Sequence, residues 1–181
     1  TVVTMPVLAL RGLTIFPNML LHFDVGRDTS IKALDQAMSE GLPIFLVAQR
    51  DLSVEEPGQE DLYHIGTISN VKQILRLPGG NVRVMVEGSS RGRLLGLSQS
   101  APFLQGAVEY LPVPEHTRNT PKTEALIRST YELFESYAGL SPRMTGDVLI
   151  SVLASDDPGY IADYIAQNIA MRASDKQGIL E

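Results

Sequence analysis

The sequence predicts an α+β protein in which a partly closed β structure with one helix precedes a bundle of helices. Three observations predict this class. Short apolar runs separated by turn residues fill the chain up to about Leu111, a proline-rich segment follows, and the apolar period then becomes that of amphipathic helices. The 181 residues, 44% of them hydrophobic, suffice for one large core or two modest ones. We predict two domains, residues 1–113 and 114–181.

Strands are expected where apolar residues alternate or form short runs between turns. The clearest case is a β-hairpin within Val71–Glu87, VKQILRLPGGNVRVMVE, in which three valines alternate with Arg83, Met85 and Glu87. Its proline and two glycines suit a tight turn. Further strands are expected at Val7–Leu10, Leu13–Phe16, Leu20–Val25, Ile44–Ala48, Ile65–Val71, Arg93–Leu97 and Gly106–Leu111.

One helix is expected inside the β-rich half. Between Asp28 and Glu40, apolar residues recur at helical spacing behind a start signal at Thr29 or Ser30, and Gly41 supplies the stop.

The second half is expected to be a helical bundle. Residues 112–122, PVPEHTRNTPK, lack an apolar period and form the junction. Pro121, Ser141-Pro142 and Asp157-Pro158 then each open a helix. The side chains expected to face inward are Leu126, Leu133, Phe134 and Tyr137, then Met144, Val148, Leu149, Val152 and Leu153, then Ile161, Tyr164, Ile165, Asn168 and Ile169.

A last helix is expected near the end of the sequence. Ser174 and Gln177 have the spacing of a capping box, but too few residues follow to sustain an isolated helix. We therefore expect this sequence to be part of a longer polypeptide.

Composition limits the classes of partner and the compartment. A formal charge of −6 argues against a general role on nucleic acid, and the arginines at 76, 83, 91 and 93 are interpreted as a solvated strand face. The absence of cysteine removes disulfides and thiol chemistry and suits a reducing cytoplasm. The first residues do not have the pattern of a signal peptide, and no apolar run approaches the ~20 residues that span a membrane, so a cytoplasmic location is expected.

No catalytic, cofactor-binding or metal-binding residues are expected. A P-loop requires a Gly-Lys dipeptide, which this sequence lacks, and neither HExxH nor GxSxG occurs. His22, His64 and His116 are scattered and are interpreted as structural or surface residues. The acidic run Glu55–Asp61 does not have the spacing of a calcium loop and is interpreted as a solvated loop.

Several short strings, in this order, carry a resemblance to a known family. They are PVLALR at 6–11, FPNM at 16–19, VGR at 25–27, LVAQ at 46–49, DLY at 61–63, IGT at 65–67 and VEG at 86–88. Together they resemble the amino-terminal domain of the Lon family of ATP-dependent serine proteases, and the helical half is similar to its continuation in bacterial members. Ala9, Asn18 and the run Leu21-His22-Phe23 depart from the common pattern.

The resemblance implies a PUA-like β subdomain followed by a helical bundle. It also implies a non-catalytic, substrate-recognising and assembly-supporting role within a cytoplasmic homohexamer that degrades misfolded and regulatory proteins in protein quality control and stress responses. The AAA+ module, which uses ATP and Mg, and the Ser-Lys protease module are absent from this sequence. Two alternatives stay open: a purely architectural subunit-docking domain, and a weak nucleic-acid-binding module.

A receptor for unfolded proteins needs exposed, adaptable apolar surface. Methionine suits this role because its side chain is flexible and polarizable. We expect Met85 to point outward because it alternates with the hairpin valines, while core packing is the alternative for every candidate. The candidate substrate contacts are Phe16, Pro17, Met19, Leu20, Leu77 and Met85.

Overall fold

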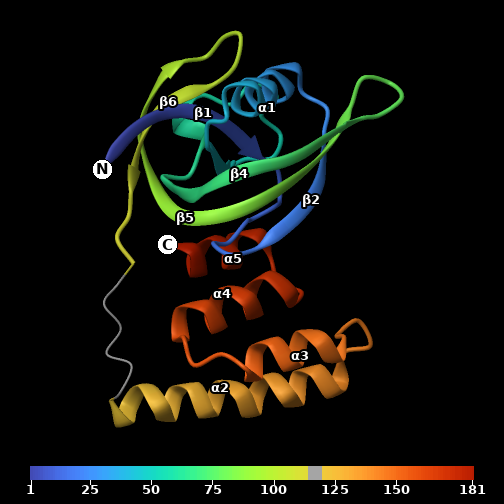
Figure 1. Cartoon of the computed structure of the whole chain (residues 1–181), viewed down its shortest axis with the longest axis vertical. Helices are drawn as coiled ribbons and strands as arrows, with labels where there is room; N and C mark the ends of the chain where they lie inside the picture. Colours follow the sequence, from blue (N-terminus) through green and yellow to red (C-terminus); the bar gives the residue numbers. More distant parts are fainter. Residues whose placement is uncertain (114–119) are drawn as a thin grey trace. The chain divides into compact units, whose positions relative to one another are not determined.

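The computed structural model describes residues 1–113 and 120–181 and confirms the α+β class (Figure 1). The chain divides into two compact units. Thr1–Pro112 together with Ala173–Glu181 form the first, here called the sheet unit, and Val113–Arg172 form the second, the helical unit. The centre of the expected junction at 112–122, with His116, lies outside the described residues.

The sheet unit contains six strands in one mixed sheet of order β2-β5-β4-β3-β1-β6. Its β6 pairs with β5 as well as with β1, so the sheet curls into a partial ring without becoming a barrel. Only β1 and β3 run parallel, and the chain between them contains α1. The elements are β1 (Val2–Leu10), β2 (Leu20–Val25), α1 (Asp28–Glu40), β3 (Ile44–Ala48), the 3₁₀ turn η1 (Gln59–Asp61), β4 (Ile65–Arg76), β5 (Val82–Gln99) and β6 (Gln105–Tyr110).

The predicted hairpin is confirmed as β4 and β5, with Arg76 paired to Val82. Leu77 N–H donates to the Asn81 carbonyl over 2.9 Å, and the two turn glycines have φ angles of 89° and 90°. The strands are longer than the sequence indicated, since β5 continues through Gly88 and Gly92. The expected strand at Leu13–Phe16 is wrong, because those residues form a loop.

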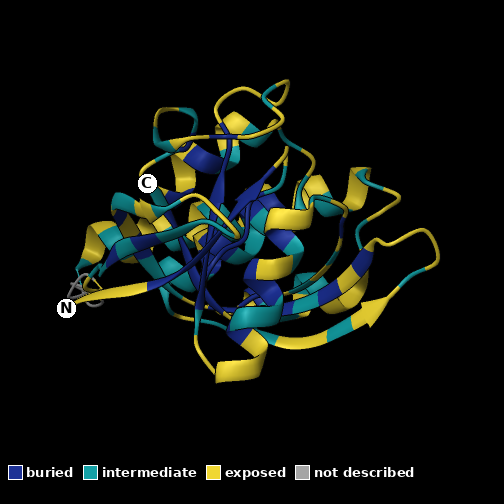
Figure 2. Cartoon of the chain, turned by 90° about the horizontal axis from the view of Figure 1, so that it is seen from above, coloured by how far each residue is buried: buried dark blue, intermediate teal, exposed yellow. Residues whose placement is uncertain are grey.

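Two apolar clusters fill the sheet unit, and β1 and β3 contribute to both. Their side chains alternate: Leu8 and Leu46 face the cluster beneath α1, whereas Val7 and Phe45 face the other. This burial on both faces explains the nearly continuous apolar runs of these strands. In Figure 2, dark blue marks these buried strand residues.

The helix α1 ends as predicted at Gly41, which has a φ of 63°. Its start differs from the sequence-based expectation. The N-cap position is Arg27, which provides no side-chain cap, so Thr29 and Ser30 lie inside the first turn. Arg27 instead turns its guanidinium toward other partners, described below.

The helical unit contains α2 (Pro121–Leu140), α3 (Gly146–Leu153) and α4 (Pro158–Asn168). Thr120 and Asp157 cap the first and third of these, each followed by proline, as the sequence indicated. The expected start of a helix at Ser141-Pro142 is wrong, since α3 begins four residues later behind Thr145.

The core of the helical unit is centred on Phe134, Val152 and Ile161. Ile127 and Tyr131 complete the inner face of α2. The expected inner stripe was therefore rotated: Leu126 and Leu133 are exposed, as are Tyr137, Leu153 and Asn168. Leu126 and Leu133 are seven residues apart, as are Ile127 and Phe134, so helical spacing allows either pair to be buried, and the residues of the neighbouring helices decide which face is.

The last helix, α5 (Ala173–Leu180), belongs to the sheet unit. The predicted capping box of Ser174 and Gln177 is wrong, because α5 already begins at Ala173; Gln177 Nε2 instead donates to the Ile65 carbonyl over 2.9 Å. Arg91 Nε donates to the Leu180 carbonyl over 2.8 Å, and the Leu180 side chain is buried. Tertiary contacts of this kind hold a helix too short to persist alone.

Candidate functional site

The strands β2, β5 and β4 present one continuous surface, which we call the outer face. Cross-strand register places its members together, because His22 pairs with Met85 and Met85 pairs with Gln73. The alternate residues on the opposite side, such as Val84 and Val86, are fully buried. The outer face consists of Leu20, His22, Asp24, Arg83, Met85, Glu87, Gln73 and Leu75.

Apolar side chains cross the outer face diagonally. Leu20 pairs with Glu87 and Leu75 with Arg83, so each leucine is a diagonal neighbour of Met85, which lies between them. Leu20 is 57% exposed and Leu75 is 52% exposed, while Met85 is half-buried. The three side chains form an apolar stripe over three strands. Leu75 was missed by sequence reasoning, although its alternation with Ile74 could have indicated an outward position.

Ion pairs border this stripe. Arg83 contacts Asp24 through two hydrogen bonds of 2.7 and 3.0 Å, and Lys72 contacts Glu87 at 2.6 Å. The hydrogen bond from Arg83 lowers the pKa of the Asp24 carboxyl below its ordinary value. These pairs neutralise the charges around the stripe; the first joins β2 to β5 and the second joins β4 to β5.

The other sequence-predicted contacts lie in the interior. Phe16, Pro17 and Met19 are buried, so they are part of the packing beneath the surface in this structure. Asn18 N–H donates to the Gly88 carbonyl, Gly88 N–H donates to the Met19 carbonyl, and Asn18 has a φ of 63°, which together form a β-bulge. A Cβ on Gly88 would lie 2.3 Å from the Phe16 carbonyl oxygen, so the loop packs closely only because residue 88 is glycine. Leu77 is half-buried beside the hairpin turn.

A cavity of about 460 Å³ lies between β2 and the end of β1. Its apolar wall contains Leu8, Leu10, Leu13, Phe23 and Val25, and its polar wall contains Arg11, Asp24, Arg27 and Ser30. A second cavity of about 330 Å³ shares Arg27 and Ser30 with the first. Arg27 therefore separates two hollows next to the start of α1.

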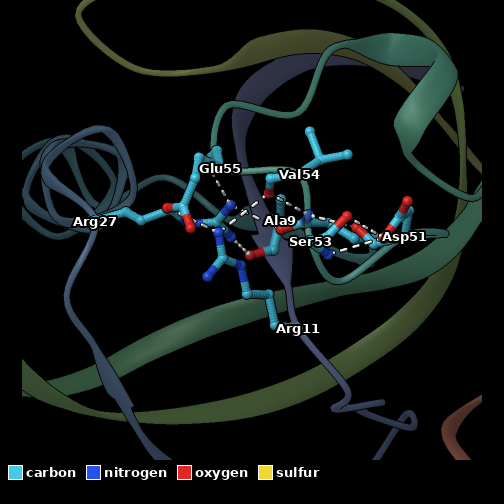
Figure 3. A network of polar contacts seen from close by, with 8 residues as sticks. Ala9, Arg11, Arg27, Asp51, Ser53, Val54 and Glu55 are labelled. Atoms are coloured by element: carbon cyan, nitrogen blue, oxygen red, sulfur yellow. Dashed lines mark hydrogen bonds and ion pairs between the residues drawn. The ribbon is translucent and has the colours of Figure 1, made fainter.

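Arg27 anchors the loop that follows β3 (Figure 3). Its guanidinium donates to the Ala9 carbonyl over 2.6 Å and to Gln49 Oε1 over 2.7 Å. Burial, and then repulsion by Arg11, lower the pKa of Arg27. Arg11 contacts the Glu55 carboxylate at 3.2 Å. The acidic run is thus solvated, as predicted, but is also tethered to β1 through these two arginines.

The arginines of the β4 and β5 strands are engaged with acidic or carbonyl groups. Arg76 contacts Asp35 at 2.7 Å, Arg93 contacts Glu109 at 3.2 Å, and Arg91 binds the carbonyl of Leu180. Cations that are paired in this way do not form the continuous basic surface on which phosphate backbones bind.

Residues 1–113 and 120–181 contain neither a metal centre nor a membrane-spanning helix. There, no three side chains of the types that ligate metals come together, and no helix is long and apolar enough to cross a membrane. His22 and His64 are both exposed, while His116 lies outside these ranges.

The helix α2 carries a second exposed apolar surface. Leu126, Leu133 and Leu140 recur every seven residues on the side away from Phe134 and are 60%, 70% and 86% exposed. A seven-residue repeat of leucines is typical of a helix that packs along another helix. We call these three residues the leucine face.

Comparisons with known proteins place the chain among well-characterised relatives. Residues 4–181 match the family described as the ATP-dependent protease La (LON) substrate-binding domain. The Lon protease of Clostridioides difficile (strain 630) is 43% identical over 180 residues, which cover 98% of this chain and 23% of that protein. The Lon protease of Escherichia coli (strain K12) is 38% identical over 179 residues, which cover 99% of this chain and 23% of that protein. The chain thus spans about a quarter of the length of these curated relatives.

A solved structure has the same fold. The N-terminal domain of Mycobacterium avium complex Lon protease superposes with a TM-score of 0.69 and covers 98% of this chain and 95% of that one at 20% identity. At this level of identity the similarity extends to the fold alone.

Proposed function

This chain belongs to the LON substrate-binding domain family, and on that premise we propose that its outer face binds apolar segments exposed by unfolded or damaged proteins. The substrate-binding role is that of the family; the surface is our assignment. The observation that carries it is the diagonal of Leu20, Met85 and Leu75 across three strands, bordered by paired charges. An exposed apolar stripe with a flexible methionine at its centre suits partners of varied sequence.

Binding by one domain is expected to be weak. Apolar burial contributes about 25 cal/mol per Å², and part of this is offset by the ordering of the bound segment. Useful affinity would come from several copies of the domain acting together, as in the homohexamer that the resemblance implied. Leu77 extends the stripe toward the hairpin turn. Phe16, Pro17 and Met19, which are buried, would take part only if the loop opened.

The wider setting is part of the same proposal. We assign the chain to an ATP-dependent Lon protease that degrades misfolded and regulatory proteins in the cytoplasm. In this family the parts that hydrolyse ATP and cleave peptide bonds lie outside the substrate-binding domain. The 181-residue chain would then bind clients without turning over ATP or cutting them.

The test is a titration of the 181-residue chain with a permanently unfolded protein, such as a reduced and carboxymethylated globular protein, and with its folded counterpart. Met85→Asp and Leu75→Asp are each expected to weaken binding of the unfolded form at least about fivefold, because they place a charge in the stripe. Leu95→Asp is the matched control, since Leu95 is 49% exposed on β5 outside the outer face. Equal binding by all variants would remove the outer face from the proposal.

The leucine face supports a second candidate, the architectural role. A row of Leu126, Leu133 and Leu140 exposed on α2 is suited to docking a helix of a neighbouring subunit. Sedimentation of the chain with Leu133→Asp alongside tests this role. Self-association that the variant abolishes would support docking, and a monomer at every concentration would count against it.

A further inference from the structure

The outer edge of β2 has no strand partner among the described residues. This strand lies at one end of the sheet order and pairs only with β5 (Figure 1). An unpaired edge presents amide and carbonyl groups that can pair with another extended chain. Proteins usually protect such edges with a covering loop, a bulge or charge, and here the bulge at Asn18 protects only the beginning of β2.

The register identifies which backbone groups face the free edge. Gly88 N–H donates to the Met19 carbonyl, so residues 19 and 88 form a hydrogen-bonded pair. In an antiparallel ladder such pairs alternate with pairs whose amides and carbonyls point away from the partner strand. Leu21 and Phe23 therefore bond to β5, and the N–H and C=O groups of His22 and Asp24 point toward the free edge.

The cavity of about 460 Å³ adjoins this edge. Residues 23–27 line it from the β2 side, and residues 8–11 of the β1 segment line it from the other. A chain laid along β2 would point every second side chain to the same face as Phe23, toward Leu8, Leu10 and Leu13. Its intervening side chains would extend the outer face beside His22. Edge and cavity thus fit the same extended segment.

The end of the β2 edge that lies near α1 carries positive charge. Arg27 follows β2 through Gly26, and Arg11 lies in the same cavity wall. Arg11 contacts the Glu55 carboxylate and Asp24 is paired with Arg83, whereas Arg27 donates to the neutral oxygens of Ala9, Gln49 and Glu55. Arg27 is also the N-cap of α1, where no side chain caps the first turn. This end is cationic and complements a carboxylate.

We propose that the seam between β2 and the end of β1 takes an extended, alternately apolar segment of a client polypeptide as an added strand, with a carboxylate of that segment near Arg11 and Arg27. This inference rests on the proposed function and names its mode of recognition. Backbone hydrogen bonds to His22 and Asp24 supply binding that does not depend on sequence, and the cavity selects apolar side chains at alternate positions.

The first test leaves the protein unchanged. The probe is a ten-residue peptide of alternating valine and threonine that ends in glutamate and an amide, compared with the same peptide N-methylated at alternate residues. The unmethylated peptide is expected to bind the 181-residue chain at least about tenfold more tightly, because methylation removes donors from the added strand. Equal affinity overturns the proposal.

The second test uses the edge itself. His22→Pro removes an outward N–H without removing a bond to β5, and proline is tolerated at such edge positions. His22→Pro is expected to bind the peptide about tenfold more weakly than His22→Ala, which lacks the same imidazole but keeps the amide. In the unmodified chain, hydrogen exchange at His22 and Asp24 should slow on peptide binding. Unchanged exchange at both amides overturns the proposal even if the proline variant misfolds.

Further peptides test the cationic end of the site, and two variants distinguish strand addition from binding on the outer face. A peptide ending in lysine amide is expected to bind about fivefold more weakly than the glutamate peptide, and one with a free terminal carboxylate after valine distinguishes a terminal from a side-chain carboxylate. Tighter binding of the lysine peptide overturns the assigned end. Loss of unfolded-protein binding in Met85→Asp but not in His22→Pro would retain the outer face and overturn strand addition. The reverse would retain strand addition and overturn the outer face.

Discussion

The two units of this chain bury their apolar residues to very different extents. In the sheet unit, β1 and β3 are buried on both faces, and Phe45, Val82 and Val108 have no exposed surface. In the helical unit, the buried centre consists of Phe134, Val152 and Ile161, while the leucine face of α2 is open to solvent. The sheet unit is organised around buried apolar residues, whereas the helical unit leaves apolar side chains exposed outside its own core.

This difference indicates which parts of the domain are open to partners. A residue inside the sheet unit is constrained by packing, so partners can bind only at its exposed positions, among which we propose the outer face and the free edge of β2. The helical unit is small, and small units bury a lower fraction of their surface. Its leucine face therefore suits docking more than stability.

Phe45→Ala should have the largest effect. Phe45 is fully buried in the second cluster of the sheet unit, and removing its ring would leave a cavity that costs about 4 kcal/mol of unfolding free energy. Urea denaturation followed by circular dichroism measures the loss. Phe45→Leu is the milder control and should cost less than half as much. A cost below that of Phe134→Ala would contradict the contrast between the units.

Phe134→Ala should come second, at about 3 kcal/mol, because Phe134 is 4% exposed within a smaller cluster. Hydrogen exchange read separately for the amides of α2 and of β3 measures the effect in each unit. We expect faster exchange in α2 with little change in β3. Equal acceleration in both would mean that the two units unfold as one.

Asp157→Ala should lower the free energy of unfolding by about 1 kcal/mol, because it removes the N-cap of α4. The Asp157 carboxylate accepts hydrogen bonds from the amides of Gly159 and Tyr160 over 3.0 and 3.2 Å at the start of α4. Thr120→Ala removes one such bond, to Thr123, and should cost less. Thermal denaturation of both variants measures the difference. An unchanged melting temperature for Asp157→Ala would show that this cap does not stabilise the unit.

Asp24→Asn should have the smallest effect, and one that depends on pH. Arg83 lowers the folded-state pKa of Asp24 below its ordinary value of 3.8, so the pair stabilises the fold at pH values above that value. Its contribution is lost as the pH falls through the lowered pKa and the carboxylate becomes protonated. Wild type and variant should therefore differ slightly at pH 7, less in high salt, and not at all in strong acid. Denaturation at three pH values tests this, and a difference that grows in acid would contradict it.

Much of the fold could be predicted from sequence signals that act over a few residues. Proline at 121 and 158 behind Thr120 and Asp157 indicated two helix starts, and β2 and β3 have the expected bounds. Predictions of helix starts were wrong where the same residues could also serve another role. Ser141-Pro142 forms the connection after α2, and Gln177 serves a tertiary hydrogen bond in place of a cap. At Gln177 a tertiary contact overrides the local preference, whereas at Ser141 a local turn forms, in which Met144 N–H donates to the Ser141 carbonyl.

The candidate site was harder to predict from the sequence, because tertiary contacts decide which of its residues are exposed. Alternation with buried valines indicates that Met85 faces outward, because a strand has a fixed two-residue period. No such period applies to the loop Phe16–Met19, and its burial depends on a glycine at position 88, far away in the chain. The cavity beside β2 likewise combines residues from two strands that do not pair with each other.

The sequence by itself determined the α+β class, the hairpin with its turn, the helical character of the second half and the resemblance to its family. Each of these depends on periods and turn residues that act over a few positions. Only the tertiary structure decided which face of α2 is buried, that α5 belongs with the sheet, and that one edge of β2 is free. Those outcomes depend on which distant segments meet, because an apolar side chain is buried only where another element covers it.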